Sequence, residues 1–507
     1  MNVILTPEQM LRCDAFSIGA VTAQGGSPYL FMERAAEACV SVLLKSFSGA
    51  KRVLVLAGNG ANGGDGIAAA RILRTRGVME ADVCMPGENA RLSASCEEQK
   101  RRAAEAGVPF LPFAELDFSR YDAVIDALFG TGLSRPLDGV FASAVRAMNG
   151  SGLPVLSVDI PSGVDGRTGA VLGEAVRAEV TVTMQYAKPG LYLYPGADCA
   201  GDIRIADLGI GREALGGETV LSALSDDDIP EFLPKRAKNG NKGTFGHILI
   251  AAGSETMSGA AYLSAKAAYR LGAGLVRILT PEENRVILAE KLPEALITTY
   301  DARHPDPGIF RSAVRWADVT VLGPGIGTSE GARRMAQTVL DAQSEKRRPI
   351  VLDADALNLL SAGEIVLPKE RGPVIFTPHP GEFSRLTGRP IPELLADLTE
   401  NAREYAKTLG PGAVLAAKDA RTVVTDGETV YLNLSGCSAL AKGGSGDVLT
   451  GMIAALCASG CSPLHAAALG VFLHGRAGEA LAGTWGTRGV LASDLPDAAA
   501  VLLKNFE

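Results

Sequence analysis

The feature that most constrains this chain is a regular alternation of short, almost continuous apolar runs with longer amphipathic stretches. Parallel strands that are buried on both faces need near-continuous apolar sequence, and a helical crossover must connect each strand to the next. The alternation therefore predicts an α/β fold with largely parallel sheets. The predicted strands are 53–57, 81–85, 122–126, 154–159, 180–184 and 203–206, then 247–252, 275–279, 319–323, 349–353, 373–377 and 413–417, with an antiparallel hairpin at 421–425 and 429–433.

A segment between about Gly209 and Gly246 interrupts the alternation. It is rich in Gly, Asp, Pro and Lys and has no periodic apolar pattern, which is typical of a connection between domains. At roughly 100–200 residues per domain, a chain of 507 residues is also too long for one core. We therefore predict two doubly wound α/β domains, at residues 1–215 and 225–507.

Charge, cysteine usage and the N-terminal sequence restrict the function classes. Lys and Arg number 49 against 57 Asp and Glu, and the longest basic run is Lys100-Arg101-Arg102, which argues against nucleic-acid binding. Eight cysteines without a CxxC pair indicate buried free thiols rather than disulfides or zinc. The N-terminus lacks the pattern of a signal peptide, and no apolar stretch is long enough to span a bilayer. We expect a cytoplasmic protein without a membrane partner.

The first candidate site is a glycine-rich loop. The strand at 53–57 leads into the stretch from Gly58 to Gly66, and a helical pattern follows from Ile67. Glycines let a backbone approach a phosphate, and a helix N-terminus offers free N–H donors. The dinucleotide fingerprint also needs an acidic residue at the end of the next strand, and the stretch 83–86 has none. The loop thus favours phosphate binding without hydride transfer.

Two further strand ends carry carboxylates, Asp126 and Asp159. Because the carboxyl ends of parallel strands line one crevice, these residues can converge there with Asn62, Asp65 and Ser162. Amide, hydroxyl and carboxylate oxygens could hold a monovalent or hard cation, and a second carboxylate would remain for acid–base chemistry. The alternative is that each Asp only caps a helix or turn.

The motifs AGNGANGGDG, DALFGTGL, VDIPSGVDGRTG and Lys188-Pro189-Gly190 occur in this order and resemble the NAD(P)H-hydrate epimerase domain over residues 1–215. The resemblance implies a Rossmann-like three-layer sandwich that interconverts the R and S epimers of NADHX and NADPHX, which are hydrated at C6 of the nicotinamide ring. It implies a potassium ion at Asn62, Asp126 and Ser162, and it makes Asp159 the catalytic group and a substrate contact. The other implied substrate contacts are Ala61, Asn62, Gly63, Gly64, Asp65, Gly130, Thr131, Gly132, Leu133, Ser134, Arg135 and Pro136.

The second candidate site is the stretch from Ala441 to Asp447, which opens a helical pattern. Successive glycine N–H groups at a helix N-terminus form a pocket for the charge on a transferring phosphoryl group, and an adjacent Asp can take a proton from an attacking hydroxyl. The chain contains no Walker A sequence. The stretch therefore favours phosphoryl transfer without a P-loop, the alternative being a structural loop capped by Asp447.

GGSGD resembles the anion-hole motif of the ribokinase-like superfamily, and LGPGIGT, LDADALNLL and TPHPGEFSRL extend the resemblance to the ADP- or ATP-dependent NAD(P)H-hydrate dehydratase domain over about 230–507. The resemblance implies that ADP with Mg²⁺ phosphorylates the C6 hydroxyl of the S epimer, that phosphate then leaves to regenerate NAD(P)H, and that AMP is the coproduct. It makes Asp447 the catalytic base. The implied substrate contacts are Ala260, Gly327, His379 and Asp447, and the implied nucleotide contacts are Lys418, Asp419, Ala420, Arg421, Thr422, Gly443, Gly444, Ser445 and Gly446.

Two stretches depart from the family pattern. Asp419 follows Lys418 where a glycine is usual, and Cys437-Ser438 replaces an Asn-Pro pair. His474, within an apolar helical pattern, is predicted to be a core residue. The leading hypothesis is a bifunctional repair enzyme, expected to form a homo-oligomer, whose partners are NADHX, NADPHX and ADP or ATP. The alternative is a small-molecule kinase of the ribokinase superfamily with a non-catalytic N-terminal nucleotide-binding module.

Overall fold

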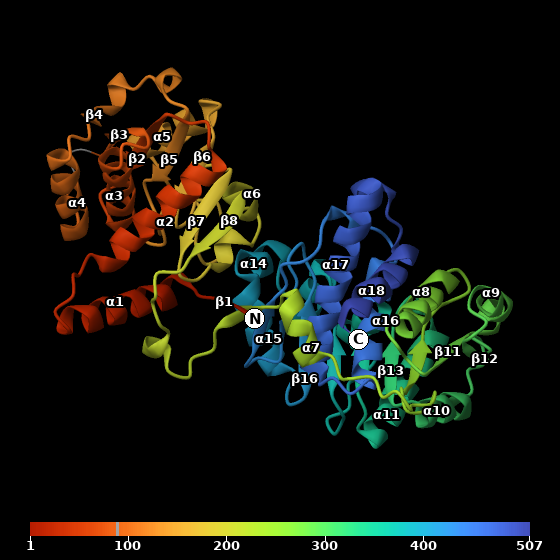
Figure 1. Ribbon diagram of the computed structural model, residues 1–507. Coiled ribbons are helices and arrows are strands. Elements are labelled where there is room, and N and C mark those ends of the chain that lie inside the picture. The colour runs from red at the N-terminus through yellow and green to blue at the C-terminus, as the bar shows by residue number, and fades with distance from the viewer. Residues whose placement is uncertain (88–90, 507) are drawn as a thin grey trace. The chain divides into compact units, whose positions relative to one another are not determined.

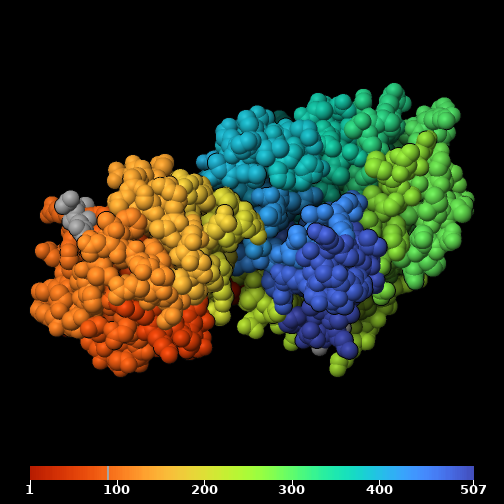
Figure 2. All heavy atoms as spheres, turned by 90° about the horizontal axis from the view of Figure 1, so that it is seen from above, coloured from red at the N-terminus to blue at the C-terminus, as the bar shows by residue number. Residues whose placement is uncertain are grey.

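The computed structural model describes residues 1–87 and 91–506. The chain divides into two compact units, Val3–Val220 and Leu221–Glu507, and Met1–Asn2 belongs to the second. Each unit is an α/β structure with its own sheet (Figure 1), and its side chains fill a closely packed body, red to yellow for the first and green to blue for the second in Figure 2. The predicted α/β fold class is confirmed.

The N-terminal unit contains a seven-stranded sheet in which every neighbouring pair is parallel. Its order is β4-β3-β2-β5-β6-β7-β8, so the direction of winding reverses between β2 and β5. In open α/β sheets, ligands bind outside the carboxyl ends of the strands at such a switch point. The strands are β2 (Arg52–Ala57), β3 (Glu80–Cys84), β4 (Phe110–Leu111), β5 (Ala123–Ala127), β6 (Val155–Val158), β7 (Val180–Met184) and β8 (Asp202–Ala206).

Helices cover both faces of this sheet, as the near-continuous apolar strands require. Val53 and Val55 join the core beneath α2 and α3, whereas Leu54 and Leu56 point the opposite way, into a second core beneath α5. The unit is therefore a three-layer sandwich. Its helices are α1 (Pro7–Ala23), α2 (Leu30–Ser46), α3 (Ala61–Thr75), α4 (Ala94–Glu105), α5 (Gly139–Gly150) and the short α6 (Ala197–Ala200).

The glycine-rich loop of this unit is shorter than the sequence predicts. The helix was expected from Ile67, but α3 begins at Ala61, so most of the motif forms its first turns. A Cβ at Gly63 would lie 1.9 Å from the Gly58 carbonyl, and one at Gly66 would lie 2.4 Å from Ala127 Cβ. These glycines are needed for the close approach of helix to strand, whereas helix propensity alone assigns them to a loop.

The C-terminal unit contains an eleven-stranded sheet, ordered β1-β9-β18-β17-β16-β15-β14-β13-β10-β11-β12. In this order, every neighbouring pair between β16 and β12, including β10 and β11, is parallel. The strand β17 pairs antiparallel with β16 and with β18, and β17 and β18 form the predicted hairpin. The winding reverses between β10 and β13. The strands are β1 (Asn2–Ile4), β9 (Leu221–Ala223), β10 (His247–Ala251), β11 (Leu275–Pro281), β12 (Leu296–Tyr300), β13 (Val319–Leu322), β14 (Ile350–Leu352), β15 (Val374–Phe376), β16 (Ala413–Ala417), β17 (Val423–Thr425) and β18 (Val430–Leu432).

The main core of this unit lies between the sheet and α8, α16, α17 and α18, which lie together in Figure 1. Ile248, Ile250, Val319 and Val321 contribute to it from alternate positions of β10 and β13. The helices are α7 (Ile229–Phe232), α8 (Ser258–Arg270), α9 (Arg285–Lys291), α10 (Pro307–Trp316), α11 (Glu330–Lys346), α12 (Asp355–Ser361), α13 (Pro380–Thr387), α14 (Ile391–Ala396), α15 (Leu398–Thr408), α16 (Ser445–Ala458), α17 (Pro463–Gly489) and α18 (Leu495–Leu503).

Four strands were not predicted: β1, β4, β9 and β12. β1, β4 and β9 have only two or three residues, and two half-buried threonines, Thr298 and Thr299, interrupt the apolar run of β12. The position of β9 matters most, because it pairs with β18 and thus belongs to the second sheet. The sequence-based limits of 215 and 225 leave this strand in the connection between the domains.

None of the eight cysteines forms a disulfide; seven are buried and Cys437 is half-buried. No helix in the described part of the chain is long and apolar enough to cross a bilayer.

Candidate functional sites

Asp126 lies near the end of β5 and is fully buried. Its Oδ1 atom accepts hydrogen bonds from the Ser162 hydroxyl at 2.6 Å and the Leu128 amide at 3.3 Å. Its Oδ2 atom accepts from the Ser157 hydroxyl and the Ser162 amide, both at 2.8 Å. Burial raises the pKa of this carboxyl, although the four hydrogen bonds oppose the shift. Asp126 thus joins β5, β6 and the loop that carries Ser162.

Asp159 follows β6 directly and has a left-handed backbone, with φ of 69°. Its Oδ1 atom accepts hydrogen bonds from the Lys188 ammonium at 2.5 Å, the Met184 amide at 3.2 Å and the Thr183 hydroxyl at 3.3 Å. Lys188 is completely buried and also donates to the Thr183 hydroxyl and the Met184 carbonyl, both at 3.1 Å. Such unusual backbone conformations in non-glycine residues occur preferentially at functional sites.

The other oxygen of Asp159 faces the loop after β5. A Cβ at Gly130 would lie 3.2 Å from Asp159 Oδ2 and 3.0 Å from Asn62 Oδ1. Gly130 therefore brings together Asp159, the first turn of α3 and the start of the loop 130–136. Asn62 Nδ2 is buried and has no hydrogen-bond partner in the described part of the chain. Of the other predicted contacts in this loop, Gly132, Ser134, Arg135 and Pro136 are exposed.

The amide oxygen of Asn62 and the hydroxyl oxygen of Ser162 are of the kind that binds hard cations. Ser162 Oγ lies 3.2 Å from the Phe129 carbonyl oxygen, and the Asn62 amide oxygen lies beside the next residue, Gly130. Each oxygen of Asp126 already accepts two hydrogen bonds, which occupy its four lone-pair positions. In this arrangement Asp126 would not be a direct ligand of a cation. It would stabilise the cation by its negative charge and would orient the Ser162 hydroxyl.

Two further carboxyls belong to this cluster. Asp14 on α1 is half-buried; burial raises its pKa to about 6, while Lys188 opposes the shift and Asp159 adds to it. Burial, Asp159 and Asp14 also raise the pKa of Asp65 well above its usual range. Asp65 was a predicted contact, but Asp14 was missed, because no motif connects it with strands more than 100 residues away.

In the C-terminal unit, the predicted site residues follow the carboxyl ends of neighbouring parallel strands. Lys418 follows β16, His379 follows β15, and Gly327 lies in the loop after β13. Ala260 is in the first turn of α8, after β10, and a Cβ at Gly325 would lie 2.9 Å from its Cβ. Ala260 and Gly327 thus lie at the β10/β13 switch point, where a ligand is expected.

The predicted anion-hole loop runs into the N-terminus of α16. Gly444, which precedes the helix, has φ of 90°, and Ser445 is buried. The Ser445 hydroxyl lies 3.1 Å from His474 Nε2 of α17. His474 is therefore a core residue, as predicted, but one that also holds this loop. Burial lowers its pKa to about 4, which keeps the ring neutral at neutral pH.

Asp353, directly after β14, links three elements of this site. It is 2% exposed, and its Oδ1 atom accepts hydrogen bonds from the Lys418 ammonium at 2.9 Å and the Thr377 hydroxyl at 2.8 Å. Its Oδ2 atom accepts from the Thr450 hydroxyl of α16 at 2.9 Å. Burial opposes its ionisation, but Lys418 and the hydroxyls outweigh this effect and hold the pKa of Asp353 below its usual value. Sequence reasoning did not assign Asp353, although it ends a predicted strand as Asp159 does.

Asp447, in the first turn of α16, is half-buried, and its carboxylate accepts no hydrogen bond from the described residues. Its backbone carbonyl accepts one from the Ser264 hydroxyl of α8 at 2.8 Å. Burial and the Asp353 carboxylate raise the pKa of Asp447 to about 7, although Lys418 opposes the shift. A carboxylate with this pKa beside a helix N-terminus can accept a proton near neutral pH.

His379 is the N-cap of α13, and its Nδ1 atom accepts a hydrogen bond from the Gly381 amide at 3.0 Å. This bond places the ring proton on Nε2, which lies 3.2 Å from Glu382. Burial and the charges of Lys418 and Arg385 lower the pKa of His379. A half-exposed neutral imidazole is compatible with substrate contact.

The remaining nucleotide contacts predicted from sequence, Asp419, Ala420, Arg421 and Thr422, form the turn between β16 and β17. Asp419 and Ala420 are exposed, and Thr422 is buried. Cys437 precedes a 3-10 turn, Ser438–Leu440, that leads into the anion-hole loop. The two departures from the family pattern, Asp419 and Cys437-Ser438, therefore lie beside Lys418 and before Gly444, and both Lys418 and Gly444 are retained.

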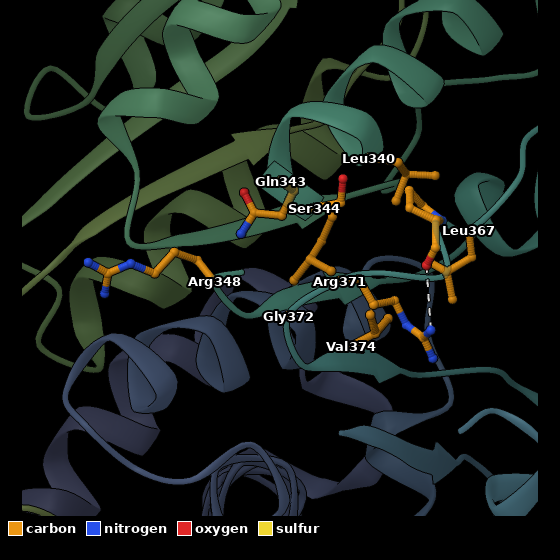
Figure 3. A pocket seen from close by; sticks show the side chains of 10 residues that line it. Leu340, Gln343, Ser344, Arg348, Leu367, Arg371, Gly372 and Val374 are labelled. Atoms are coloured by element: carbon orange, nitrogen blue, oxygen red, sulfur yellow. Dashed lines mark hydrogen bonds between the residues drawn. The ribbon is translucent and has the colours of Figure 1, made fainter. Parts of the chain in front are cut away.

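A pocket in this unit lies away from these residues, between the end of α11 and the amino ends of β14 and β15 (Figure 3). It contains no predicted site residue. Its lining is Leu340, Gln343, Ser344, Arg348, Ile350, Leu367, Pro368, Arg371, Gly372 and Val374. Among the described residues, no three or more His, Cys, Asp or Glu side chains are arranged to hold a metal ion.

Two family models match the chain. One described as YjeF-related protein N-terminus matches residues 29–190, and one described as NAD(P)H-hydrate dehydratase matches residues 248–500. A ribokinase-like superfamily protein from Enterococcus faecalis is 28% identical to this chain, with a TM-score of 0.51, and the match covers 56% of this chain and 96% of that one. Fold and site thus define a fusion of a Rossmann-like unit with a ribokinase-like unit that has a glycine-rich loop at the N-terminus of α16.

Relatives extend this similarity through both units. A bifunctional NAD(P)H-hydrate repair enzyme from Thermofilum pendens is 35% identical, over 96% of this chain and 95% of the relative. The one from Escherichia coli is also 35% identical, over 97% and 94%. The chain belongs to the family of bifunctional NAD(P)H-hydrate repair enzymes, and the resemblance inferred from its motifs is confirmed.

Proposed function

We propose that this chain repairs hydrated nicotinamide cofactors in two steps. The N-terminal unit interconverts R- and S-NAD(P)HX, and the C-terminal unit dehydrates the S epimer to NAD(P)H, with ADP converted to AMP and phosphate. The observation that carries the proposal is the Asp447 carboxylate, which accepts no hydrogen bond from the described residues and lies at the glycine-rich start of α16, with Lys418 close to Gly446.

In the C-terminal unit, Asp447 accepts the proton of the C6 hydroxyl as the hydroxyl oxygen attacks the β-phosphorus of ADP. The bond from that phosphorus to the bridging oxygen breaks, and AMP leaves. Phosphate then departs from C6 while a proton leaves C5, which restores the ring double bond of NAD(P)H. The backbone N–H groups at Gly444 to Gly446 face the charge on the transferring group.

Ala260, Gly327 and His379 are proposed to contact the hydrate at the β10/β13 switch point. The adenine nucleotide would lie against the turn from Lys418 to Thr422 and the loop from Gly443 to Gly446. Mg²⁺ bound with ADP would supply positive charge on the phosphates; it needs few protein carboxylates, because water and phosphate oxygens complete its coordination.

In the N-terminal unit, Asp159 is proposed as the acid–base group. The C6 hydroxyl is beside a ring nitrogen, so the centre can invert by loss and return of that hydroxyl, which requires a proton to move onto and off the oxygen. Asp159 Oδ2 lies beside Gly130, between the proposed substrate contacts of the first turns of α3 (61–65) and of the loop 130–136, and Lys188 anchors the other oxygen. A potassium ion near Asn62 and Ser162 would offset the negative charge of the cluster, with Asp126 behind it.

The test is to incubate the protein with a mixed R/S NADHX preparation and ADP or ATP, and to follow the absorbance of reduced nicotinamide. We expect nucleotide-dependent recovery of both epimers. An Asp159→Ala variant should recover only the S fraction, and an Asp447→Asn variant should recover neither. Consumption of ATP without NADH formation would instead support a small-molecule kinase. The expected homo-oligomer stays a prediction.

A further inference from the structure

Lys418 is held in one place by a single charged partner. Its ammonium lies 2.9 Å from Asp353 Oδ1, which is its only hydrogen bond within the described part of the chain, and its side chain is 19% exposed. An ammonium has three donors, so two remain available. A Cβ at Gly446 would lie 3.3 Å from Lys418 Nζ, which places these donors directly beside the anion-hole loop.

The same carboxylate also holds the helix that carries the anion hole. Asp353 Oδ2 accepts a hydrogen bond from Thr450, and this hydroxyl lies 2.9 Å from the Gly446 carbonyl as well. The hydroxyl has a single proton, and Thr450 itself belongs to α16, so the bond to Asp353 anchors this helix one turn after Gly446. Asp353 therefore holds both the Lys418 ammonium beside Gly446 and the helix that contains Gly446.

We propose that Asp353 is a positioning residue for phosphoryl transfer: it aligns the Lys418 ammonium and the first turn of α16 so that both face the transferring phosphoryl group. The inference rests on the proposed function, because it requires phosphoryl transfer at this loop. Asp353 is 2% exposed and acts on the nucleotide through Lys418 and Thr450, which donate hydrogen bonds to it.

A purely structural role accounts less well for this arrangement. A buried ion pair gains little stability over apolar residues of similar size, because the desolvation of both charges offsets their attraction. Lys418 is instead anchored by one of its three N–H donors, and the other two are open beside a helix N-terminus. Such an ammonium can stabilise negative charge in a transition state without reorganising, and this lowers the barrier of a reaction.

Removal of the Asp353 charge and removal of the Lys418 charge should shift the pKa of Asp447, the proposed base, in opposite directions. The charged groups that face Asp447 are Asp353 after β14, Lys418 after β16 and Asp355 at the start of α12. The α8 and α17 helices contribute the neutral groups Ser264 and His474 to this end of α16. Removing the Asp353 charge should lower the pKa of Asp447, and removing the Lys418 charge should raise it.

The experiment compares Asp353→Asn, Lys418→Met and the double variant in the full chain, with dehydration of S-NADHX by ADP followed across pH. We expect each single variant to lower kcat at least about tenfold. The double variant should lose less than the product of the two single losses, because Asp353 acts in part through Lys418 and in part through Thr450. The acid limb of the pH profile should move to lower pH in Asp353→Asn and to higher pH in Lys418→Met, and epimerisation should persist in all three.

Thr450 supplies a matched pair of controls. Thr450→Val removes the hydroxyl that donates a hydrogen bond to Asp353 and should lower kcat. Thr450→Ser keeps this hydroxyl and should retain most of the wild-type kcat, at a melting temperature similar to that of Thr450→Val. Multiplicative losses in the double variant, or pH profiles that do not move, would overturn the positioning role. Undiminished dehydration by Asp447→Asn would overturn the proposed function itself, which is a separate outcome.

Discussion

At the residue scale, Asp159 combines a left-handed backbone, one oxygen anchored by Lys188 and one oxygen beside Gly130. If it transfers the proton of the C6 hydroxyl, Asp159→Ala should lower the rate of R-to-S conversion at least about 100-fold. If it only caps the turn after β6 and pairs with the buried Lys188, its loss should lower stability by about 3–5 kcal/mol and leave the chemistry intact. The epimerisation rate, measured below the melting temperature of the variant, separates these outcomes.

The pKa of about 7 at Asp447 gives dehydration a defined pH dependence. A general base works in its ionised form, so kcat should be high above neutral pH and should fall as the pH drops through about 7. With an unshifted carboxyl, whose pKa is about 4, the rate would stay constant down to about pH 5. A pH–rate profile of the full chain with saturating ADP, and with epimerisation measured in parallel as a control, decides between the two.

Much of each candidate site could be predicted, because its residues follow strands in an α/β pattern. Asp126, Asp159 and Lys418 end apolar runs, and Asp447 opens a helix. Asp14 could not be found, since it reaches its cluster from α1 through tertiary packing alone. The position of Thr450, one turn beyond Gly446, carries no signal of its own until the contact with Asp353 is seen.

At the scale of elements, the strands that carry near-continuous apolar runs were predicted within one or two residues. Errors occurred where tertiary contacts override local preference. The glycines of the first motif suggest a loop, yet Gly63 and Gly66 are helical because only glycine permits the close contact of α3 with its neighbours. Strands of two or three residues, such as β4 and β9, are stabilised by pairing and leave no periodic pattern.

The entry into α16 offers a test with a control in the same loop. Gly444 has φ of 90°, and a Cβ there would lie 2.5 Å from Leu263 Cδ1, so Gly444→Ala should strain the backbone by about 1–2 kcal/mol. We expect a lower melting temperature and at least about tenfold slower dehydration. At Gly443 an added Cβ would meet no atom within 4 Å, and φ is not positive, so Gly443→Ala should keep the melting temperature. Equal melting temperatures for all three proteins would refute the strain argument.

At the scale of the whole molecule, each unit has its own sheet and core and should fold separately. A protein ending at Val220 should epimerise NADHX without nucleotide, and one beginning at Leu221, which lacks only the three-residue edge strand β1 of its sheet, should dehydrate only the S form. A second C-terminal protein that begins at Ser225 lacks β9 and exposes the edge of β18, so it should be less stable and more prone to aggregate. Equal stability of the two would show that β9 contributes nothing to this sheet.

The distribution of the cysteines makes the native chain a ready subject for site-selective labelling. Seven thiols are buried, and burial raises the pKa of several of them, including Cys457 and Cys461, so they should resist alkylation in the folded protein. Cys437 alone is half-buried, in the stretch that leads to the anion-hole loop. A fluorescent maleimide should therefore react first at Cys437. Its emission should then change when ADP binds, and no cysteine has to be introduced by mutation. Mass spectrometry of the labelled peptides would identify that position.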